Sequence, residues 1–517
     1  MQLLHTPAEL AAWRRFSPGP LHFVPTMGAL HSGHQRLIRR AAEPRGGGSP
    51  RVLVSVYVNP LQFGPGEDFD RYPRDLAADA DLAAAAGASA LFAPSPAVIQ
   101  PGGSDAITRV LPPALLQRHL CGAVRPGHFE GVATVVVRLL NLVRPDRLLL
   151  GEKDWQQLVI LRRVLADLGL PVRVEGCATE READGLACSS RNQYLSEGER
   201  RLASALPAAL TAVARDVGWR SLKKDPAAAL RARLEAAGCV VEYAEHVAAH
   251  TLEPLPEPRG LSLLAAAIRC GSTRLIDHVF LMSRSPIVAI DGPAGAGKST
   301  VTRAFAARMG LLYLDTGAMY RAVTWWVLQQ GIDPADPAAV ASCLQALDLQ
   351  LHAAPTGGQQ VLINGHDVTE AIRSPQVTER VSQVAAHACV RDALTTQQQA
   401  MGERGGLVAE GRDIGTAVFP DADLKVFLTA TPAERSRRRA RDLAERGFDV
   451  PPLAELEAQI IERDRQDSSR AVAPLRMAAD AEELVTDGMA IEAVIQSLLD
   501  LFRQRVPEEA WPLPSSM

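Results

Sequence analysis

Two short apolar segments, each followed by a glycine-containing turn and an amphipathic stretch, constrain the fold of this chain most. The first runs from LHFVPT (21–26) into MGALHSGHQRLIRRAA (27–42), and the second from PIVAIDG (286–292) into PAGAGKSTVTRAFAARMG (293–310). A strand that turns through glycine into a helix is typical of the start of a parallel α/β sheet. Because the two starts lie in different halves of the chain, the sequence predicts two α/β units.

The 517 residues suggest about three domains at roughly 150 residues per domain. We expect a doubly wound, Rossmann-like α/β part over about 1–170 and a smaller α+β part over about 180–278, which together make the first unit, 1–278. A second α/β unit is expected over 285–505. The last residues, 506–517, are expected to form a disordered tail.

Composition excludes several classes of protein. Lys and Arg total 55 and Asp and Glu 59, which gives a net charge of −4, whereas a nucleic-acid-binding protein usually carries a basic excess. The seven cysteines form no CxxC pair, which favours reduced thiols over disulfides or zinc. The first residues do not resemble a signal peptide, and the longest apolar stretch (132–143) is too short for a membrane span. We therefore expect a cytoplasmic protein with neither nucleic-acid nor membrane partners.

The segment MGALHSGH (27–34) follows the first strand and opens a helix. Gly28 and Gly33 allow close approach of the backbone, and the helix N-terminus offers free N–H groups to phosphate. His31 and His34 lie on one face and can donate hydrogen bonds to charge that develops on a triphosphate. On its own, the motif also fits a surface helix with two ordinary histidines.

Three further segments strengthen the phosphate-site interpretation. GEKD (151–154) follows a strand, LACSSR (186–191) carries two hydroxyls and an arginine, and VNPLQFGPGEDFDRYPRD (58–75) places Asn59 and Gln62 just past a strand end. Ligand sites of α/β sheets lie at such strand ends. Each segment alone could be a solvated loop, but together they indicate an adenylate-forming site.

With these motifs, and with RPGHFEGVATVVVRLLNLVRPDRLLLGEKDWQQ and READGLACSSRNQYL, the first unit resembles the pantoate–β-alanine ligase (pantothenate synthetase) family. The resemblance implies a nucleotidylyltransferase fold and, because the family is typically dimeric, a homodimer through this unit. It also implies that ATP activates pantoate to pantoyl adenylate, from which β-alanine then displaces AMP.

The same resemblance assigns roles to individual residues. His34 is the expected proton donor, and His31, Lys153, Arg191 and Mg²⁺ are expected to neutralise phosphate charge. ATP binding is assigned to Met27, Gly28, Ala29, Leu30, His31, Ser32, Gly33, His34, Gly151, Glu152, Lys153, Asp154, Glu180, Cys188, Ser189, Ser190 and Arg191. Pantoate and β-alanine binding is assigned to Gln62 and Gln157, with Asn59 beside them. Cys188 stands where the family more usually has methionine.

In the second unit, GPAGAGKST (292–300) fits the P-loop pattern G-x-x-x-x-G-K-[ST] between a strand and a helix. Its backbone N–H groups would cradle phosphates, Lys298 would reach the β/γ oxygens, and Ser299 would ligate Mg²⁺. The expected ATP contacts are Gly292, Gly295, Gly297, Lys298, Ser299 and Thr300. A P-loop by itself indicates only that a nucleoside triphosphate binds.

Arginine-bearing segments indicate an anionic acceptor for this second site. With LVAEGRDIGTAVFPDADLKVFLTA and SSRAVAPL, the unit resembles bacterial-type cytidylate kinase, which implies phosphorylation of CMP or dCMP by ATP and Mg²⁺. The hairpin-like insertion 359–370, with its Asn-Gly turn, is similar to that family's enlarged monophosphate-binding part. Thr316 (often serine) and Glu410 (often aspartate) depart mildly from the family. The resemblance assigns CMP binding to Thr316, Arg321, Ser382, Arg391, Arg412, Asp413, Arg463, Asp467 and Arg470.

The run RSRRRARDLAERG (435–447) has two interpretations. It is either a basic helix face or nucleic-acid patch, or a kinase lid whose Arg435, Arg438 and Arg439 close over ATP. Other hypotheses also remain open at this stage: one half active and the other a sensing or assembly module, or an RNA-binding protein. The favoured prediction is a chain that carries both enzymes.

Overall fold

The computed structural model describes the chain except for residues 17, 46–47, 218–224, 346, 354–358, 446, 471 and 515–517. It forms two units, which are described separately: Met1–Ser283 with Val506–Pro512, and Arg284–Arg505 with Leu513–Met517. The described part of the chain holds no helix long and apolar enough to cross a membrane.

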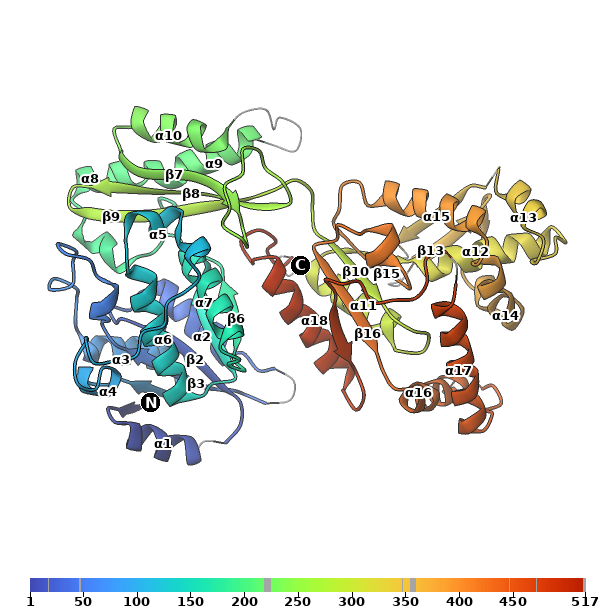
Figure 1. The fold of residues 1–517 in the computed structure, drawn as a ribbon, viewed down its shortest axis with the longest axis horizontal. Helices are drawn as coiled ribbons and strands as arrows, with labels where there is room; N and C mark the ends of the chain where they lie inside the picture. Colours follow the sequence, from blue (N-terminus) through green and yellow to red (C-terminus); the bar gives the residue numbers. More distant parts are fainter. Residues whose placement is uncertain are drawn as a thin grey trace. The chain divides into compact units, whose positions relative to one another are not determined.

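The first unit is built on a six-stranded parallel sheet (Figure 1). Its strand order, β1-β4-β3-β2-β5-β6, shows that the chain builds from β2 toward one edge and then from β5 toward the other. The sheet therefore changes direction between β2 and β5, where ligands of open α/β sheets bind. The strands are β1 (Gln2–Leu4), β2 (Leu21–Thr26), β3 (Arg51–Val56), β4 (Ala90–Phe92), β5 (Arg147–Gly151) and β6 (Arg173–Cys177).

Helices cover both faces of this sheet, and successive strand residues enter opposite cores. Phe23 and Leu148 belong to one buried cluster, whereas their neighbours Val24 and Leu149 belong to another. This alternation follows from the two-residue period of a strand. The helices are α1 (Pro7–Arg15), α2 (Ser32–Ala42), α3 (Leu76–Ala85), α4 (Pro96–Ile99), α5 (Leu120–Val124), α6 (His128–Val143) and α7 (Trp155–Asp167).

A smaller antiparallel sheet completes the first unit. Strands β7 (Val240–Ala248), β8 (Leu261–Cys270) and β9 (Thr273–Met282) form a meander, with α9 (Ala205–Val217) and α10 (Pro226–Ala236) on one face (Figure 1). Leu206, Leu230 and Leu264 share its buried core with residues near the short helix α8 (Glu197–Ala203).

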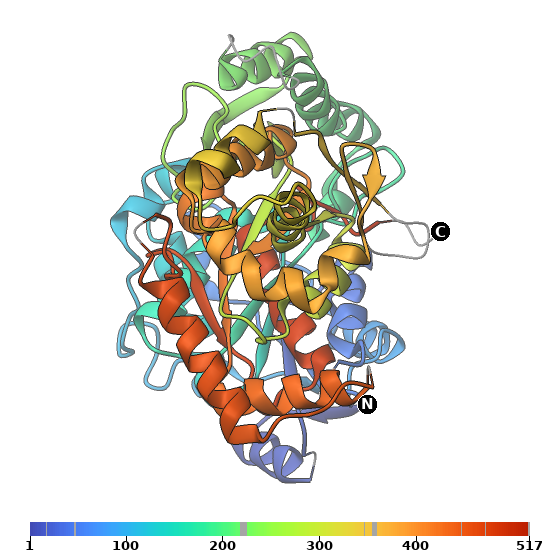
Figure 2. The ribbon, with the colours of Figure 1, turned by 90° about the vertical axis from the view of Figure 1, so that its right-hand side faces the viewer.

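The second unit is a five-stranded parallel sheet, in the order β11-β15-β10-β16-β17, which confirms the predicted α/β class. The strands are β10 (Ile287–Asp291), β11 (Leu312–Asp315), β15 (Leu407–Gly411), β16 (Leu424–Thr429) and β17 (Glu482–Val485). The helices are α11 (Lys298–Met309), α12 (Thr316–Gln329), α13 (Pro337–Leu344), α14 (Pro375–Val384), α15 (Ala388–Met401), α16 (Pro432–Glu445), α17 (Leu453–Ser468) and α18 (Ile491–Arg505). Helices α16 and α17 pack against each other and are seen in orange-red in Figure 2.

The predicted insertion is a small antiparallel sheet of β12 (Leu349–Ala353), β13 (Gln359–Ile363) and β14 (His366–Asp367). Asn364 and Gly365 join β13 to β14 with φ of 47° and 78°. Two consecutive positive φ values are what a two-residue hairpin turn requires, and Asn-Gly is the pair that tolerates them.

The end of the chain differs from the expected disordered tail. Val506–Pro512 pack with the first unit, and Val506 is 1% exposed. The tail was expected from its place at the chain terminus, whereas the contacts of Glu508 and Glu509 are made with residues far away in sequence. Residues 515–517 lie outside the described part.

Gly131 lets helix α6 approach the loop that carries two predicted substrate residues. A Cβ atom at this position would lie 2.2 Å from the Leu61 carbonyl oxygen. The Gly131 carbonyl accepts a hydrogen bond of 3.1 Å from the Asn59 side chain. The absence of a side chain here therefore fixes how the 59–62 turn sits on α6.

We expect Gly131→Ala to lower the free energy of unfolding of the first unit by about 1–3 kcal/mol, because the new methyl must push the Leu61 backbone away. The matched control is Gly198→Ala on α8, where the nearest atom to a new Cβ is 3.9 Å away. This control should be neutral or slightly stabilising, as alanine favours helices. Urea denaturation of both variants checks the prediction, which equal stability would contradict.

Candidate active sites

A cavity of about 1010 Å³ lies at the carboxyl ends of the first unit's central strands, where the strand order reverses between β2 and β5. The residues assigned to ATP and substrates from the sequence mostly line it. Those in the lining are Met27, His31, Gly33, His34, Asn59, Gln62, Gly151, Lys153, Asp154, Gln157, Glu180, Cys188, Ser189, Ser190 and Arg191. Those outside the lining are Gly28, Ala29, Leu30, Ser32 and Glu152.

The turn between β2 and α2 is held by a buried carboxylate that sequence reasoning missed. Gly28 and Ala29 have φ of 83° and 51°. Asp79 of α3 accepts hydrogen bonds from the N–H of Ala29 (3.1 Å) and of Leu30 (2.7 Å). Since a positive φ is strained for alanine, these two bonds stabilise a turn that would otherwise open.

The two histidines of the motif cap the helix that they begin. His31 Nδ1 accepts from the Gly33 N–H (3.2 Å), and His34 Nδ1 accepts from the His31 N–H (3.3 Å). A neutral imidazole that accepts at Nδ1 carries its proton on Nε2. Each ring therefore keeps an Nε2–H donor for a ligand.

Electrostatics agree with neutral rings. Burial, followed by the charge of Lys153, lowers the pKa of His31 to about 4. Burial, followed by His31 and Lys153, lowers the pKa of His34 to about 3. The ring centroids are 4.1 Å apart, so two charged imidazoles would repel each other strongly at this separation.

The GEKD segment forms a short turn directly after β5. Lys153 lies in the cavity lining with a side chain that is 20% exposed, and its Nζ is 3.9 Å from an Asp154 oxygen. Glu152 points away from the lining and is buried. Gln157, at the start of α7, completes this side of the cavity.

On another side of the cavity, the Asn59 side chain caps the turn of 60–62 and donates to Gln62 Oε1 at 3.1 Å. Two side chains, one from α6 and one from the turn before it, contact the Gln62 carbonyl oxygen. Arg125 Nη2 donates to this oxygen at 3.2 Å, and His128 Nδ1 lies 2.8 Å from it. These two residues, within the RPGHFEG segment, were not selected from the sequence although the segment was part of the resemblance.

Arg191, in the loop 189–191 (the SSR loop), lies in the cavity lining and is paired with a carboxylate. Arg191 makes two hydrogen bonds of 2.8 Å to Asp68. Ser190 Oγ lies 3.2 Å from the Tyr72 hydroxyl, and Cys188 Sγ lies 3.2 Å from Ser32 Oγ. A phosphate that recruits Arg191 must therefore replace the Asp68 carboxylate.

In the second unit, the P-loop glycines adopt backbone conformations that residues with a side chain rarely adopt. Gly292, Gly295 and Gly297 have φ of 151°, 76° and 86°, and a Cβ on Gly292 would lie 2.0 Å from the Leu428 carbonyl oxygen. Lys298 is buried and donates to the carbonyls of Gly292 (2.7 Å) and Pro293 (2.9 Å). Burial and the nearby Arg412 charge lower its pKa. Thr300 follows on the first turn of α11.

The P-loop serine meets an acidic residue at the end of β15. Ser299 Oγ donates to Glu410 Oε1 at 2.5 Å, and the Tyr313 hydroxyl donates to the same oxygen at 2.9 Å. The other oxygen, Oε2, is buried without a hydrogen-bond partner in the described part of the chain. Burial, followed by the Asp315 charge, raises the pKa of Glu410. An unsatisfied acceptor beside a P-loop hydroxyl fits Mg²⁺ bound with phosphates.

The predicted acceptor residues form a network of arginines and two buried aspartates. Arg391 Nη2 is 3.3 Å from Asp413, Arg412 Nε is 3.0 Å from Asp467, and Arg470 also bonds Asp467. Burial and neighbouring arginines lower the pKa of Arg463. An excess of buried guanidinium groups favours binding of an anion.

Two other members of the acceptor set, Arg321 and Thr316, contact residues at the ends of β11 and β15. Arg321 pairs with Asp315 at 3.0 Å, and Thr316 Oγ1 donates to the Glu410 carbonyl at 2.7 Å. The Nε atoms of Arg321, Arg391 and Arg463 are buried without a hydrogen-bond partner among the described residues. Ser382 lies on α14.

Two family models match the chain in succession. The model for pantoate-beta-alanine ligase matches residues 2–280, and the model for cytidylate kinase matches residues 288–504. The bifunctional pantoate ligase/cytidylate kinase of Parasynechococcus marenigrum (strain WH8102) is 65% identical over 513 residues, 99% of this chain and 100% of that protein. The chain belongs to this bifunctional family.

Other relatives agree with this assignment. The bifunctional pantoate ligase/cytidylate kinase of Prochlorococcus marinus (strain MIT 9313) is 66% identical over 501 residues, 97% of this chain and 99% of that protein. A solved pantothenate synthetase from Thermus thermophilus is 45% identical with a TM-score of 0.51, and covers 54% of this chain and 99% of its own. Both predicted resemblances, and the prediction of an enzyme, are confirmed.

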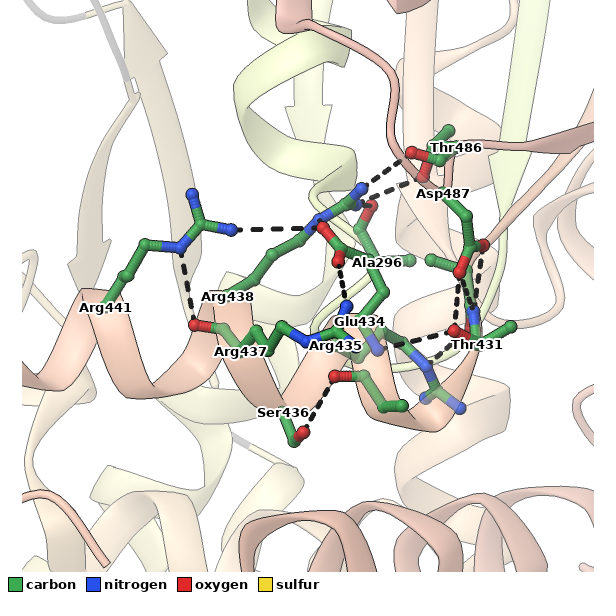
Figure 3. Close-up of polar contacts among 12 residues, drawn as sticks. Ala296, Thr431, Glu434, Arg435, Ser436, Arg437, Arg438, Arg441, Thr486 and Asp487 are labelled. Atoms are coloured by element: carbon green, nitrogen blue, oxygen red, sulfur yellow. Dashed lines mark hydrogen bonds and ion pairs between the residues drawn. The ribbon is translucent and has the colours of Figure 1, made fainter. Parts of the chain in front are cut away.

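In the kinase unit, two of the three predicted lid arginines hold helix α16 on the P-loop. Arg438 donates to the Ala296 carbonyl (3.1 Å) and to the Thr486 carbonyl (2.7 Å), as Figure 3 shows. Arg435 is buried, donates to the Ala294 carbonyl at 3.1 Å and pairs with Asp464 of α17. Arg439 is half exposed, 3.5 Å from Asp442.

The lowered pKa values of His31 and His34 give the ligase unit a defined pH dependence. The unfolded chain binds protons on both rings near pH 6.5, whereas the folded unit binds them only as the pH falls to about 4 and 3. The unfolded state therefore binds more protons between these values, so stability is lost as the pH falls below about 6.5.

We expect the imidazole NMR signals of His31 and His34 in the free protein to remain those of neutral rings from pH 8 to 5, while urea midpoints of the ligase unit fall as the pH decreases from about 6.5 to 5. His34→Gln, whose amide oxygen can still accept from the His31 N–H, should show a shallower fall. A titration of either ring near pH 6.5 would contradict the lowered pKa values.

Proposed function

We propose that the ligase unit joins pantoate to β-alanine in two steps at the cavity. The pantoate carboxylate attacks the α-phosphorus of ATP, which releases pyrophosphate and forms pantoyl adenylate. The amine of β-alanine then attacks the acyl carbon, loses a proton and displaces AMP. The observation that carries the proposal is the pair of Nε2–H donors on His31 and His34, held by reciprocal capping beside Lys153.

The chemistry needs positioning and charge neutralisation, since a carboxylate must approach a polyanion. Lys153 and the two imidazoles would bind the α-phosphate oxygens and the leaving pyrophosphate, with His34 as the proton donor. Arg191 would exchange its Asp68 partner for phosphate when the SSR loop closes on ATP. This exchange costs little Coulomb energy, because one anion replaces another.

The substrate end of the cavity is assigned to Asn59, Gln62 and Gln157. These amides offer donors to the carboxylate and acceptors to the hydroxyls of pantoate. The clamp of Arg125 and His128 on the Gln62 carbonyl fixes the backbone from which the Gln62 side chain projects.

We propose that the kinase unit transfers the γ-phosphoryl group of ATP to a phosphate oxygen of CMP or dCMP. The P-loop and Lys298 would hold the β- and γ-phosphates, and the arginine network would hold the monophosphate. Ser299 and Glu410 would hold Mg²⁺, which when bound would neutralise phosphate charge. In the ligase unit Mg²⁺ would enter with ATP.

Two further expectations stay proposals: a homodimer through the ligase unit, and a cytoplasmic location. The first rests on the resemblance to the ligase family, whose match covers residues 2–280. The second is supported by the seven cysteines, all of which are free thiols, as is usual in a reducing compartment. Sedimentation of the 517-residue chain against the monomer mass of 55.4 kDa tests the homodimer.

We expect His34→Ala and Lys153→Ala each to slow adenylate formation at least ~100-fold, the cost of one lost donor to a developing oxyanion. Pyrophosphate release with saturating pantoate measures this step. The second unit supplies the control within the same molecule, because CMP phosphorylation by these variants should be unchanged. Near-normal pyrophosphate release would disprove the assignment.

We expect Lys298→Met to abolish CDP formation, since methionine is unbranched like lysine but has no charged group to bind phosphate. Pantothenate formation by this variant should equal that of the unchanged chain. An unchanged rate of CDP formation would refute the P-loop assignment, and loss of both activities would show that the substitution unfolds the protein.

A further inference from the structure

The segment Val506–Pro512 belongs to the first unit, although it lies outside both matched ranges, 2–280 and 288–504. We call it the strap. It turns back on itself through a hydrogen bond of 3.1 Å from the Trp511 N–H to the Pro507 carbonyl. Neither family match assigns this segment a role.

The strap grips the buried carboxylate of Glu152. The N–H of Glu508 donates to Glu152 Oε1 at 2.8 Å, and the N–H of Glu509 donates to Oε2 at 2.9 Å. Two consecutive backbone N–H groups on one carboxylate form a small anion-binding nest. Glu152 is 1% exposed and directly precedes Lys153, so the grip fixes the turn that carries the phosphate-binding lysine.

The side chain of Glu508 accepts hydrogen bonds from two further segments. It accepts from Arg36 Nη2 at 3.1 Å and from the Ala178 N–H at 3.4 Å. Arg36 lies on α2, the helix begun by the two histidines, and also pairs with Glu180 at 3.2 Å. Ala178 and Glu180 line the cavity.

The side chain of Glu509 holds the next residue of the same wall. Its Oε1 accepts from the Thr179 N–H at 2.8 Å and from the Thr179 hydroxyl, and its Oε2 is 3.6 Å from His278 Nε2. Thr179 and His278 line the cavity, whereas Glu508 and Glu509 do not. The strap therefore acts on the wall from outside the cavity.

We propose that Glu508 and Glu509 are positioning residues of the ligase reaction, and that the strap fixes the ATP-binding wall formed by Gly151–Asp154 and 178–180. This proposal rests on the assignment of that wall to ATP. It makes ligase catalysis depend on residues more than 220 positions beyond the ligase match (280 against 508).

The charge balance supports a positioning role. Burial, followed by the Glu509 charge, raises the pKa of Glu152 to about 7, and the two N–H donors from the strap oppose that rise. Without the strap, Glu152 would lose both donors and would accept hydrogen bonds from water or from a displaced neighbour instead. Either change moves the backbone at Lys153, and displacements of about 1 Å can cost large factors in rate.

The test compares two shortened chains. A chain that ends at Arg505 lacks the strap, and a chain that ends at Pro512 keeps it and serves as the matched control. We expect the first to raise the KM for ATP of the ligase reaction about tenfold, with the KM for β-alanine and CMP phosphorylation within twofold of the full chain. The control should match the full chain in all three quantities.

Two substituted full-length chains separate positioning from folding. Glu508→Ala/Glu509→Ala removes the acceptors for Arg36, Ala178 and Thr179 and should also raise the KM for ATP. Glu508→Gln/Glu509→Gln keeps an acceptor oxygen at each site and should lie nearer the full chain. Hydrogen–deuterium exchange over 150–155 and 176–182 should quicken in the alanine chain and much less in the glutamine chain.

An unchanged KM for ATP in both the Arg505-terminated and the alanine chains would overturn the proposal. So would an equal loss of kinase and ligase activity, since that would show general unfolding. The result stays distinct from a failure of the ATP-site assignment. If Lys153→Ala still forms adenylate normally the assignment is wrong, and if Lys153→Ala is inactive while strap variants are normal only the strap proposal is wrong.

Discussion

In both units the phosphate-binding elements depend on a sharp turn between a parallel strand and the helix that follows. Backbone N–H groups can face a ligand there only if the turn adopts conformations that most residues avoid. In the kinase unit glycine meets this need, because Gly292 lies against the Leu428 carbonyl with no room for a Cβ. In the ligase unit Ala29 takes a positive φ, and the Asp79 carboxylate supplies the stabilisation. The placement of His31, His34 and Lys298 follows from these two turns.

A second common property is that several cations of both sites already have protein partners in the free protein. Arg191 pairs with Asp68, Arg412 pairs with Asp467, and Lys298 binds two carbonyls of its own loop. A buried cation without a partner would be costly. Each of these three cations therefore contacts an acceptor of the protein. If these residues bind phosphate as proposed, phosphate would replace their present acceptors.

The fold class and the main motifs were predictable because their signals are local. The strand, turn and helix at 21–42 and the P-loop at 292–300 each occupy one continuous stretch, and so does the Asn-Gly hairpin at 364–365. Asp79, the Arg125–His128 clamp and the strap were not predicted, because each acts on a segment distant in sequence. Asp79 is one of two aspartates in the alanine-rich helix α3, and Glu508 and Glu509 stand near the chain end. No pattern distinguishes them in the sequence from ordinary solvated side chains.

The arginines of the run 435–447 also show the difference between what the sequence predicts and what only the structure reveals. Their basic run was recognised from the sequence, but the sequence could not show that Arg435 and Arg438 bond carbonyls of the P-loop while Arg439 remains half exposed. By itself, the sequence determined two α/β units and two families, and it predicted residues for two candidate phosphate sites, since motif spacing and periodicity are properties of continuous chain. Only the tertiary structure decided which carboxylate holds each cation, which carbonyl each arginine binds and where residues 506–512 pack. Those contacts depend on distances between segments that no local pattern encodes.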